Sequence, residues 1–174
     1  MPNSAQLPEP VLAAYLRWWH GLQSPQAGGS QRAARAQLKR CHSVAAVALE
    51  PAFQQLYQQL RAAYGGQDWP PFQQDRLAAL AALGAHVQSA NDLAFPKAAS
   101  QGGEGGTAPL SPLRFRRLLD ADDIESLFVG LRRALPLIGH TLSPSQLAKD
   151  VFEWGDGVKR RWAYAYAWPA ESKS

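Results

Sequence analysis

Residues 112–123 read Pro112-Leu-Arg-Phe-Arg-Arg-Leu-Leu-Asp-Ala-Asp-Asp123, and this stretch sets the pattern for the carboxyl-terminal third of the chain. Basic residues alternate here with apolar ones at helical spacing, so a helix can bury one face and present cations on another. The pattern recurs twice downstream, which gives three basic clusters: Arg114/Arg116/Arg117, Arg132/Arg133 and Lys159/Arg160/Arg161. Helices of this kind suit a partner made of phosphates.

A fourth basic cluster lies near the amino end and contains Arg32, Arg35, Lys39 and Arg40. On a helix, Arg32, Arg35 and Lys39 gather almost opposite an apolar side formed by Ala34, Leu38 and Cys41. A charged stripe can be simply a solvated helix face, but acids are normally interspersed on such a face. None occurs between Ser30 and Ser43. Several acid-poor clusters in one short chain favour nucleic-acid binding.

The apolar spacing predicts an all-α protein made of two small helical bundles joined by a Gly-rich linker. Residues 1–95 form the first bundle, with four helices between residues 8 and 92, and no stretch has the alternation typical of a strand. Residues 96–110 are rich in Gly, Ala and Ser and predict a flexible linker. Residues 111–174 form the second bundle, in which an apolar stripe is stopped by Gly139.

Composition sets limits on the class of protein. The chain has 174 residues, is 46% hydrophobic and carries a net charge of +4, so it can bury a sizeable core and concentrate cations on one surface. A single cysteine, Cys41, forms no internal disulfide, and Cys41-His42 lacks the further ligands of a zinc site. We find neither a signal peptide nor a membrane-spanning stretch, which favours a cytoplasmic protein without membrane contact.

The sequence offers no convincing catalytic site, metal site or cofactor motif. The densest acids are Asp120, Asp122 and Asp123, between two expected helices, where an aspartate caps free backbone amides. The stretch Gly102-Gly-Glu-Gly-Gly lacks the Gly-Lys-Ser/Thr ending that grips phosphate and magnesium in a P-loop. Among the aromatic residues we expect Trp18 and Trp19 in and around the core, Trp154, Trp162 and Tyr166 in the core, and Trp168 on the surface. The cations therefore carry the argument for binding.

These segments resemble the small-subunit (CasB) family of type I-E CRISPR Cascade, the RNA-guided surveillance complex of bacteria. The similarity is clearest from Pro112 to Tyr166, in Arg-Phe-Arg-Arg-Leu-Leu-x-Ala-Asp-Asp, Leu-Arg-Arg-Ala-Leu, Asp-x-x-x-Trp-Gly and Arg-Arg-Trp-x-x-x-Tyr. Trp18-Trp19, the helix from Gln31 to Arg40 and Glu50-Pro-Ala-Phe-x-x-Leu-Tyr agree more loosely. The glycine-rich segment over residues 100–106 departs from the family pattern.

The resemblance implies an all-helical subunit without catalytic activity. Its partners would be the guide RNA, the target and displaced DNA strands, the backbone and large subunits of Cascade, and a second copy in a head-to-tail dimer. The subunit would hold the R-loop open through sequence-independent contacts with the nucleic-acid backbone. The residues expected to bind nucleic acid are Arg32, Arg35, Lys39, Arg40, Arg114, Arg116, Arg117, Arg132, Arg133, Lys159, Arg160 and Arg161.

Two other functions remain open from the residues alone. A helical adaptor would use the same cations to bind an acidic protein partner. A helix-turn-helix regulator would use residues 143–157 as the supporting helix and the last helix as the reader. That last helix offers mainly Lys159, Arg160 and Arg161, without the Asn, Gln and Ser set typical of base recognition.

Overall fold

The structure is a computed structural model that describes residues 6–101 and 106–170. Its elements run in the order α1 (Glu9–Gln23), α2 (Gly29–Lys39), α3 (Val44–Ala48), α4 (Pro51–Ala63), α5 (Pro71–His86), β1 (Ser89–Ala90), α6 (Phe95–Ser100), α7 (Pro112–Leu119), α8 (Ile124–Ala134), the 3-10 helix η2 (Leu135–Ile138), β2 (Thr141–Leu142), α9 (Pro144–Phe152) and α10 (Asp156–Ala165). The prediction of an all-α fold is therefore confirmed for the architecture as a whole.

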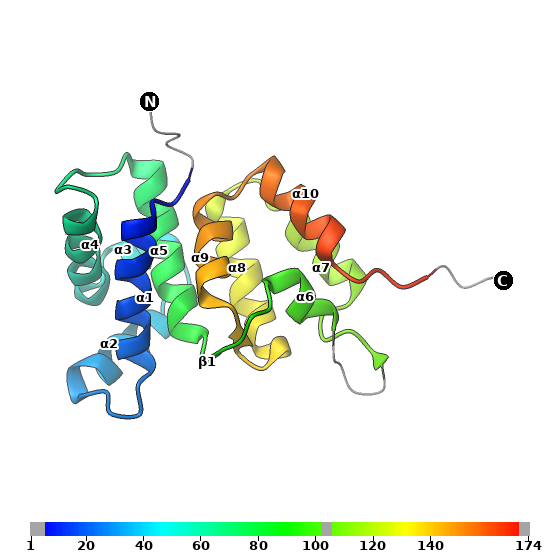
Figure 1. The fold of residues 1–174 in the computed structure, drawn as a ribbon, viewed down its shortest axis with the longest axis horizontal. Coiled ribbons are helices and arrows are strands. Elements are labelled where there is room, and N and C mark those ends of the chain that lie inside the picture. Colours follow the sequence, from blue (N-terminus) through cyan, green and yellow to red (C-terminus); the bar gives the residue numbers. More distant parts are fainter. Residues whose placement is uncertain (1–5, 102–105, 171–174) are drawn as a thin grey trace.

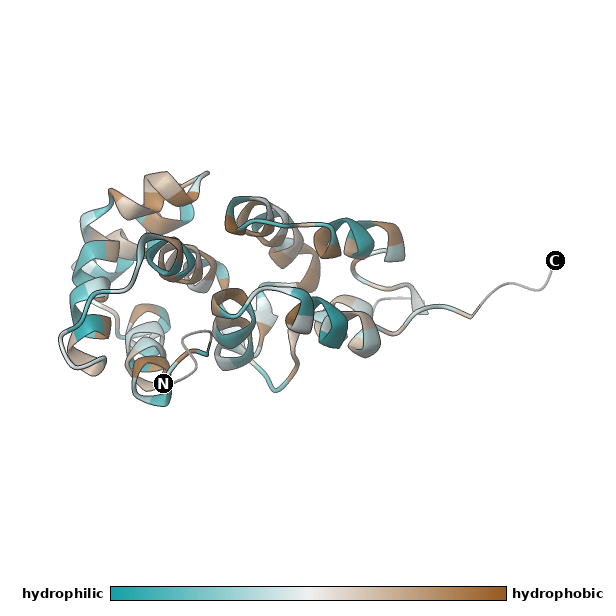
Figure 2. Ribbon diagram, turned by 90° about the horizontal axis from the view of Figure 1, so that it is seen from above, coloured by the Kyte–Doolittle hydropathy of each residue, from teal (hydrophilic) through white to brown (hydrophobic). Residues whose placement is uncertain are grey.

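Helix α5 is the centre of the fold. Every residue from Leu77 to His86 is buried, which is typical of a helix surrounded by others. Helices α1 to α4 pack on one side of it, and α8 and α9 on the other, as Figure 1 shows. Figure 2 shows hydrophobic helix faces turned towards neighbouring helices. The buried apolar side chains of both halves of the chain form one core.

Two aromatic side chains fix α1 on α5. The Tyr15 hydroxyl donates to the Leu80 carbonyl at 3.0 Å, and the Trp19 indole nitrogen donates to the Gly84 carbonyl at 3.0 Å. Such a close approach is possible because Gly84 has no side chain: a Cβ there would overlap the Tyr15 hydroxyl. Trp19 is buried and Trp18 half-buried, which confirms the prediction that they lie in and around the core.

A second aromatic cluster holds α6, α7 and α10 together at the other end of the molecule. Phe95 lies 4.9 Å from Trp162 between ring centres, and Phe115 stacks on Tyr166 at 4.2 Å. The indole of Trp154 donates to the Ala121 carbonyl at 2.8 Å. Trp154, Trp162 and Tyr166 are buried, whereas Trp168 is 45% exposed, so the prediction for these four residues is confirmed.

The structure departs from the predicted secondary structure in three places. Residues 8–92 contain five helices instead of four, because the short α3, capped by the Ser43 hydroxyl, has too few turns to show a period. The prediction of no strand is wrong for β1 and β2, which pair in parallel over two residues each, too few to show alternation. Helix α8 ends at Ala134, two residues before Pro136, and the chain continues as η2 to Gly139, which adopts a positive φ of 68°.

The segment predicted as a linker, residues 96–110, contains ordered structure at both ends. Helix α6 begins at Phe95, whose ring is buried, and buries Ala98 and Ala99 as well. Leu110 is also buried, and its backbone amide donates to the Ala99 carbonyl at 2.9 Å. Alanines count towards a linker by composition, yet here they pack. Residues 102–105, the centre of the glycine run, lie outside the described residues, and the division into bundles at 1–95 and 111–174 stays a prediction.

No helix in the described part of the chain is both long enough and apolar enough to cross a membrane.

The close packing of α1 on α5 generates the first prediction. Gly84→Ala should lower the free energy of unfolding by about 1–3 kcal/mol, because the added methyl group forces Tyr15 and α1 away from α5. Chemical denaturation measures this change.

Gly157→Ala is the matched control, since Gly157 lies in α10 with open space around the position of a Cβ. This variant should be about 0.4–1 kcal/mol more stable than the parent chain, because alanine restricts the unfolded chain more than glycine. Equal effects of the two substitutions would contradict the assignment of Gly84 to a closely packed helix crossing.

Candidate nucleic-acid interface

Helix α7 presents the first group of cations. Ser111 caps it by accepting a hydrogen bond from the Arg114 amide at 3.3 Å, and Pro112 occupies the first turn. Phe115 and Leu118 are buried against the aromatic cluster, so the remaining faces of this short helix point to solvent. These faces carry the exposed side chains of Arg114, Arg116 and Arg117. The predicted orientation of the helix is therefore confirmed.

Helix α8 separates two neighbouring cations. Leu127, Leu131 and Ala134 are buried, and consecutive residues differ by about 100° around the helix axis. Arg133 is exposed and turns towards α7. Arg132 is half-buried and turns towards α2, where its guanidinium donates to the Lys39 carbonyl at 3.2 Å. Arg132 thus joins the end of α8 to the end of α2.

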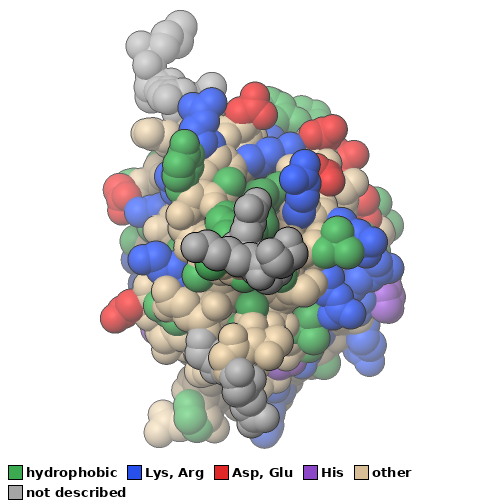
Figure 3. Space-filling view, turned by 90° about the vertical axis from the view of Figure 1, so that its right-hand side faces the viewer, with side chains coloured by type: hydrophobic (Ala, Val, Ile, Leu, Met, Phe, Trp, Pro, Cys, Tyr) green, Lys and Arg blue, Asp and Glu red, His purple; other side chains and the backbone are tan. Residues whose placement is uncertain are grey.

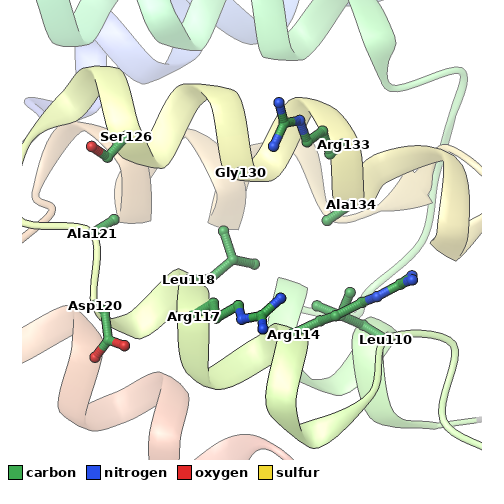
Figure 4. Close-up of a pocket in the computed structure, with 10 residues that line it drawn as sticks. All are labelled: Leu110, Arg114, Arg117, Leu118, Asp120, Ala121, Ser126, Gly130, Arg133 and Ala134. Atoms are coloured by element: carbon green, nitrogen blue, oxygen red, sulfur yellow. The ribbon is translucent and has the colours of Figure 1, made fainter.

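Arg133 lines the same groove between α7 and α8 as Arg114 and Arg117, and Figure 4 shows its side chain lying along α8 while the other two extend from α7. The groove has a volume of 460 Å³. Four almost fully buried apolar residues contribute to its lining: Leu110, Leu118, Ala121 and Ala134. Sequence reasoning identified the three arginines but missed the groove. The signal that could have indicated it is the single glycine of the α8 pattern, Gly130, where a Cβ would overlap the Leu118 side chain.

Helix α2 has the two faces that its sequence predicts. Leu38 and Cys41 are buried, and Ala34 is half-buried beside them. Arg32 and Arg40 are exposed. Two cations are partly engaged within the protein: Arg35 donates to the Gln23 side chain at 3.0 Å, and Lys39 is half-buried near Arg132.

The ends of α2, α5 and α8 meet in a region of positive potential. His86, the last residue of α5, has its pKa lowered from 6.5 to about 4, first by burial and then by the positive charges of Arg132 and Lys39 and by His140. The His140 ring nitrogen Nδ1 lies 2.9 Å from the His86 carbonyl, which holds the two histidines together. Two basic clusters that are some 90 residues apart in the sequence are therefore neighbours in space.

Helix α10 differs from the other basic helices because acids balance part of its charge. Lys159 pairs with Asp122 at 2.9 Å, and Arg161 pairs with the buried Asp150 at 3.4 Å. Arg160 is exposed and has no ion pair with any described residue. The third basic cluster thus offers one unpaired cation, fewer than its sequence suggests.

Asp150 itself holds α9 to α10. It accepts hydrogen bonds from the Trp162 indole at 2.9 Å and from the Gln146 amide at 3.0 Å. Burial raises the pKa of this carboxyl, and the hydrogen bonds and Arg161 oppose the rise. Its position explains why Arg161 lies along the protein surface and is less free to meet a phosphate.

The predicted capping role holds for one of the three aspartates. Asp123 accepts a hydrogen bond from the Ser126 amide at 2.7 Å, and this bond lowers the pKa of the Asp123 carboxyl. Asp122 is instead the partner of Lys159, and Asp120 follows the end of α7. Nowhere in residues 6–101 and 106–170 do three or more His, Cys, Asp or Glu side chains come together as a possible metal site.

Figure 3 shows the end of the molecule that carries α7 and α10, with Lys and Arg side chains gathered along one side of it and several acids above them. None of the predicted cations on or next to α2, α7 and α8 forms an ion pair with a described residue. These cations are Arg32, Arg35, Lys39, Arg40, Arg114, Arg116, Arg117, Arg132 and Arg133. Acids do lie nearby, since Asp120 lines a groove with three of these arginines, but none of them pairs with a cation of α2, α7 or α8 within the described residues.

The contrast between Arg132 and Arg133 generates a second prediction. Arg133→Glu should change the free energy of unfolding by no more than about 0.5 kcal/mol, because its side chain is exposed. Arg132→Glu should lower it by about 1–3 kcal/mol, because it removes the hydrogen bond to Lys39 and places a carboxylate against carbonyls at the end of α2. Denaturation of the two variants in parallel measures the difference, and equal stabilities would contradict the structural role of Arg132.

A third prediction follows from the pKa of His86. Because the folded chain holds this imidazole neutral, its contribution to stability is present above pH 6.5 and is lost as the pH falls from 6.5 towards 4. His86→Gln should flatten the decline of the unfolding free energy across this range. His42→Gln, at an exposed position, is the control for the replacement of a histidine by glutamine. Denaturation curves at several pH values provide the test, and the same decline in both variants would contradict the shifted pKa.

Comparison with known proteins shows the family to which this chain belongs. The model for the CRISPR-associated protein Cse2 matches residues 34–166, and no curated protein sequence matches the chain. A similar solved chain occurs in the crystal structure of E. coli Cascade bound to a PAM-containing double-stranded DNA target. The two chains are 18% identical, the match covers 87% of this chain and 92% of the other, and the TM-score is 0.63, which shows a shared fold. Because the family model spans most of the chain, including α7, α8 and α10, this protein belongs to the Cse2 family, the CasB-type small subunits that its sequence resembles.

Proposed function

We propose that this protein is the non-catalytic small subunit of a type I-E Cascade complex and that it binds the backbones of the target DNA, the displaced DNA and the guide RNA without reading their sequence. One observation carries the proposal. The exposed cations of α2, α7 and α8 have no acidic partner among the described residues, so their charge is available to another molecule. The Cse2 family match supports the assignment to a Cascade complex, in which these cations would meet nucleic acid.

Physical chemistry explains how such a surface helps to open DNA. Exchange of a DNA duplex for an RNA–DNA heteroduplex is nearly balanced in free energy, so contacts between protein and backbone can decide its direction. Each phosphate neutralised by Arg or Lys releases counterions whatever the base. Arg114, Arg117 and Arg133 lie on two adjacent helices, and Lys39, Arg40 and Arg132 form a second group of cations at the end of α2. In this role the protein catalyses no reaction and needs no cofactor.

The exposed apolar residues suit the protein partners of this role, namely the backbone and large subunits and a second copy arranged head to tail. Leu49 and Phe72 lie on the half of the molecule that carries α3 and α5, whereas Tyr164 lies on α10 at the opposite end (Figure 1). A head-to-tail contact joins two different surfaces of the same chain, and it therefore needs apolar patches at both ends. We place this assembly in the cytoplasm, where the complex would meet its DNA.

The proposed function predicts that charge reversal at the groove reduces R-loop formation. Arg117→Glu in the assembled complex should weaken binding of a target duplex and lower the slope of log affinity against log salt by about 0.7–0.9, because each lost phosphate contact removes that amount. Gel-shift titration at several salt concentrations measures both quantities.

Arg17→Glu is the matched control, because Arg17 is an exposed arginine on α1, outside the predicted set. It makes the same change in charge and should leave both quantities near the parent values. Normal R-loop formation by a fully assembled Arg117→Glu complex would show that the interface is assigned wrongly. A chain that binds an acidic protein but does not join the other Cascade subunits would favour the adaptor function.

A further inference from the structure

The groove between α7 and α8 differs in chemistry from the rest of the basic surface. Its floor is apolar, since Leu110 and Ala134 are 2% exposed and Leu118 is 5% exposed. Figure 4 shows Leu118 pointing from α7 towards Gly130 of α8, where the absence of a side chain leaves room for it. Helices α7 and α8 thus pack closely where Leu118 lies against Gly130, and the groove opens beside this contact.

Three arginines line the groove beside this apolar floor. Arg114 and Arg117 extend from α7 in the same direction, and the Arg133 side chain lies along α8 (Figure 4). None of the three forms an ion pair with a described residue. Asp120 also lines the groove, but Figure 4 shows its carboxylate directed away from Arg117. The upper part of the groove is therefore suited to an anion.

Phosphate alone does not account for this combination. A phosphate group gains from the arginines and gains nothing from leucine and alanine beneath them. The fitting ligand carries an anion and a flat, largely apolar part, which describes one nucleotide. The volume of 460 Å³ lies within the range of about 300–1,000 Å³ that is typical of pockets for small molecules. Bases that leave a double helix pack against apolar side chains and on the planes of arginine guanidinium groups.

We propose that the α7–α8 groove holds one unpaired nucleotide of a single strand, with its base on the apolar floor and its phosphates on the arginines. This inference rests on the proposed function and adds to it a preference for single strands, because the bases of a duplex are stacked inside and cannot enter. Polar groups able to read a base edge are few, with Ser126 and Asp120 at one end of the groove. The groove therefore tolerates any base.

The test compares two strands with the same number of phosphates. Fluorescence anisotropy at a fixed salt concentration measures the affinity of the full chain for a short oligothymidylate and for an abasic strand of the same length. The oligothymidylate should bind about fivefold more tightly, which corresponds to the burial of about 40 Å² of apolar base surface. The salt slopes of the two strands should be the same, because their phosphate contacts are the same.

Two pairs of variants locate the preference. Ser126→Leu fills the groove from an exposed position without adding a ring on which a base can stack, and it keeps the bond from its backbone amide to Asp123, so it should bring the affinity ratio near one with little change for the abasic strand. Ala62→Leu, at an exposed position of α4, should keep the ratio. Arg117→Gln in the groove and Arg116→Gln outside it should each weaken both strands equally and keep the ratio, because these arginines contact phosphates, which both strands carry.

The outcomes separate this inference from the proposed function. Salt-dependent binding with equal affinity for the two strands would overturn the nucleotide groove and leave the backbone interface intact. Failure to bind either strand would overturn both. Competition by free thymidine monophosphate as strong as that by the strand would show a site for a soluble nucleotide and would overturn the assignment to a nucleic-acid strand.

Discussion

The burial of the second part of α5, Leu77 to His86, on all sides is the constraint from which the rest of the structure follows. A helix in that position offers its neighbours an apolar surface, and it approaches them closely because much of its second half is alanine and glycine. Helix α1 uses this closeness to place Tyr15 and Trp19 on the carbonyls of Leu80 and Gly84. Helices α8 and α9 occupy the opposite side. With this part of α5 apolar, the four basic clusters lie on the helices around it.

The same arrangement brings three helix ends together, and this explains where the positive charge concentrates. Carbonyl groups at helix ends favour cations, and Arg132 satisfies one of them at the end of α2. Its neighbour Arg133 makes no such contact and faces the groove. Adjacent residues of one basic cluster therefore serve different purposes: Arg132 contributes to the fold, and Arg133 remains available for a partner.

Helix faces could be predicted from the sequence because a period of 3.6 residues shows directly which side is apolar. Leu38 in α2 and Phe115 in α7 are buried as their spacing indicates, and this alone oriented the neighbouring arginines. Contacts between distant segments could not be predicted in this way. The pairing of Lys159 with Asp122 joins residues that are 37 positions apart, and no local pattern announces it. The α7–α8 groove likewise depends on how two helices cross. Within α8, Gly130 is the one sequence feature that indicates this crossing.

Cations alone do not explain how a protein surface could prefer separated strands to a duplex. A duplex has a higher charge density than a single strand, so each contact with it releases more counterions, about 0.9 against about 0.7. A purely cationic surface therefore favours rewound DNA over separated strands. A subunit that keeps strands apart needs a favourable contribution that only an unpaired nucleotide supplies, and contact between an exposed base and apolar side chains is such a contribution. The arrangement of Arg114, Arg117 and Arg133 around Leu118 and Ala134 offers charge and apolar contact at one place, so the binding we propose there would depend on the strand being open.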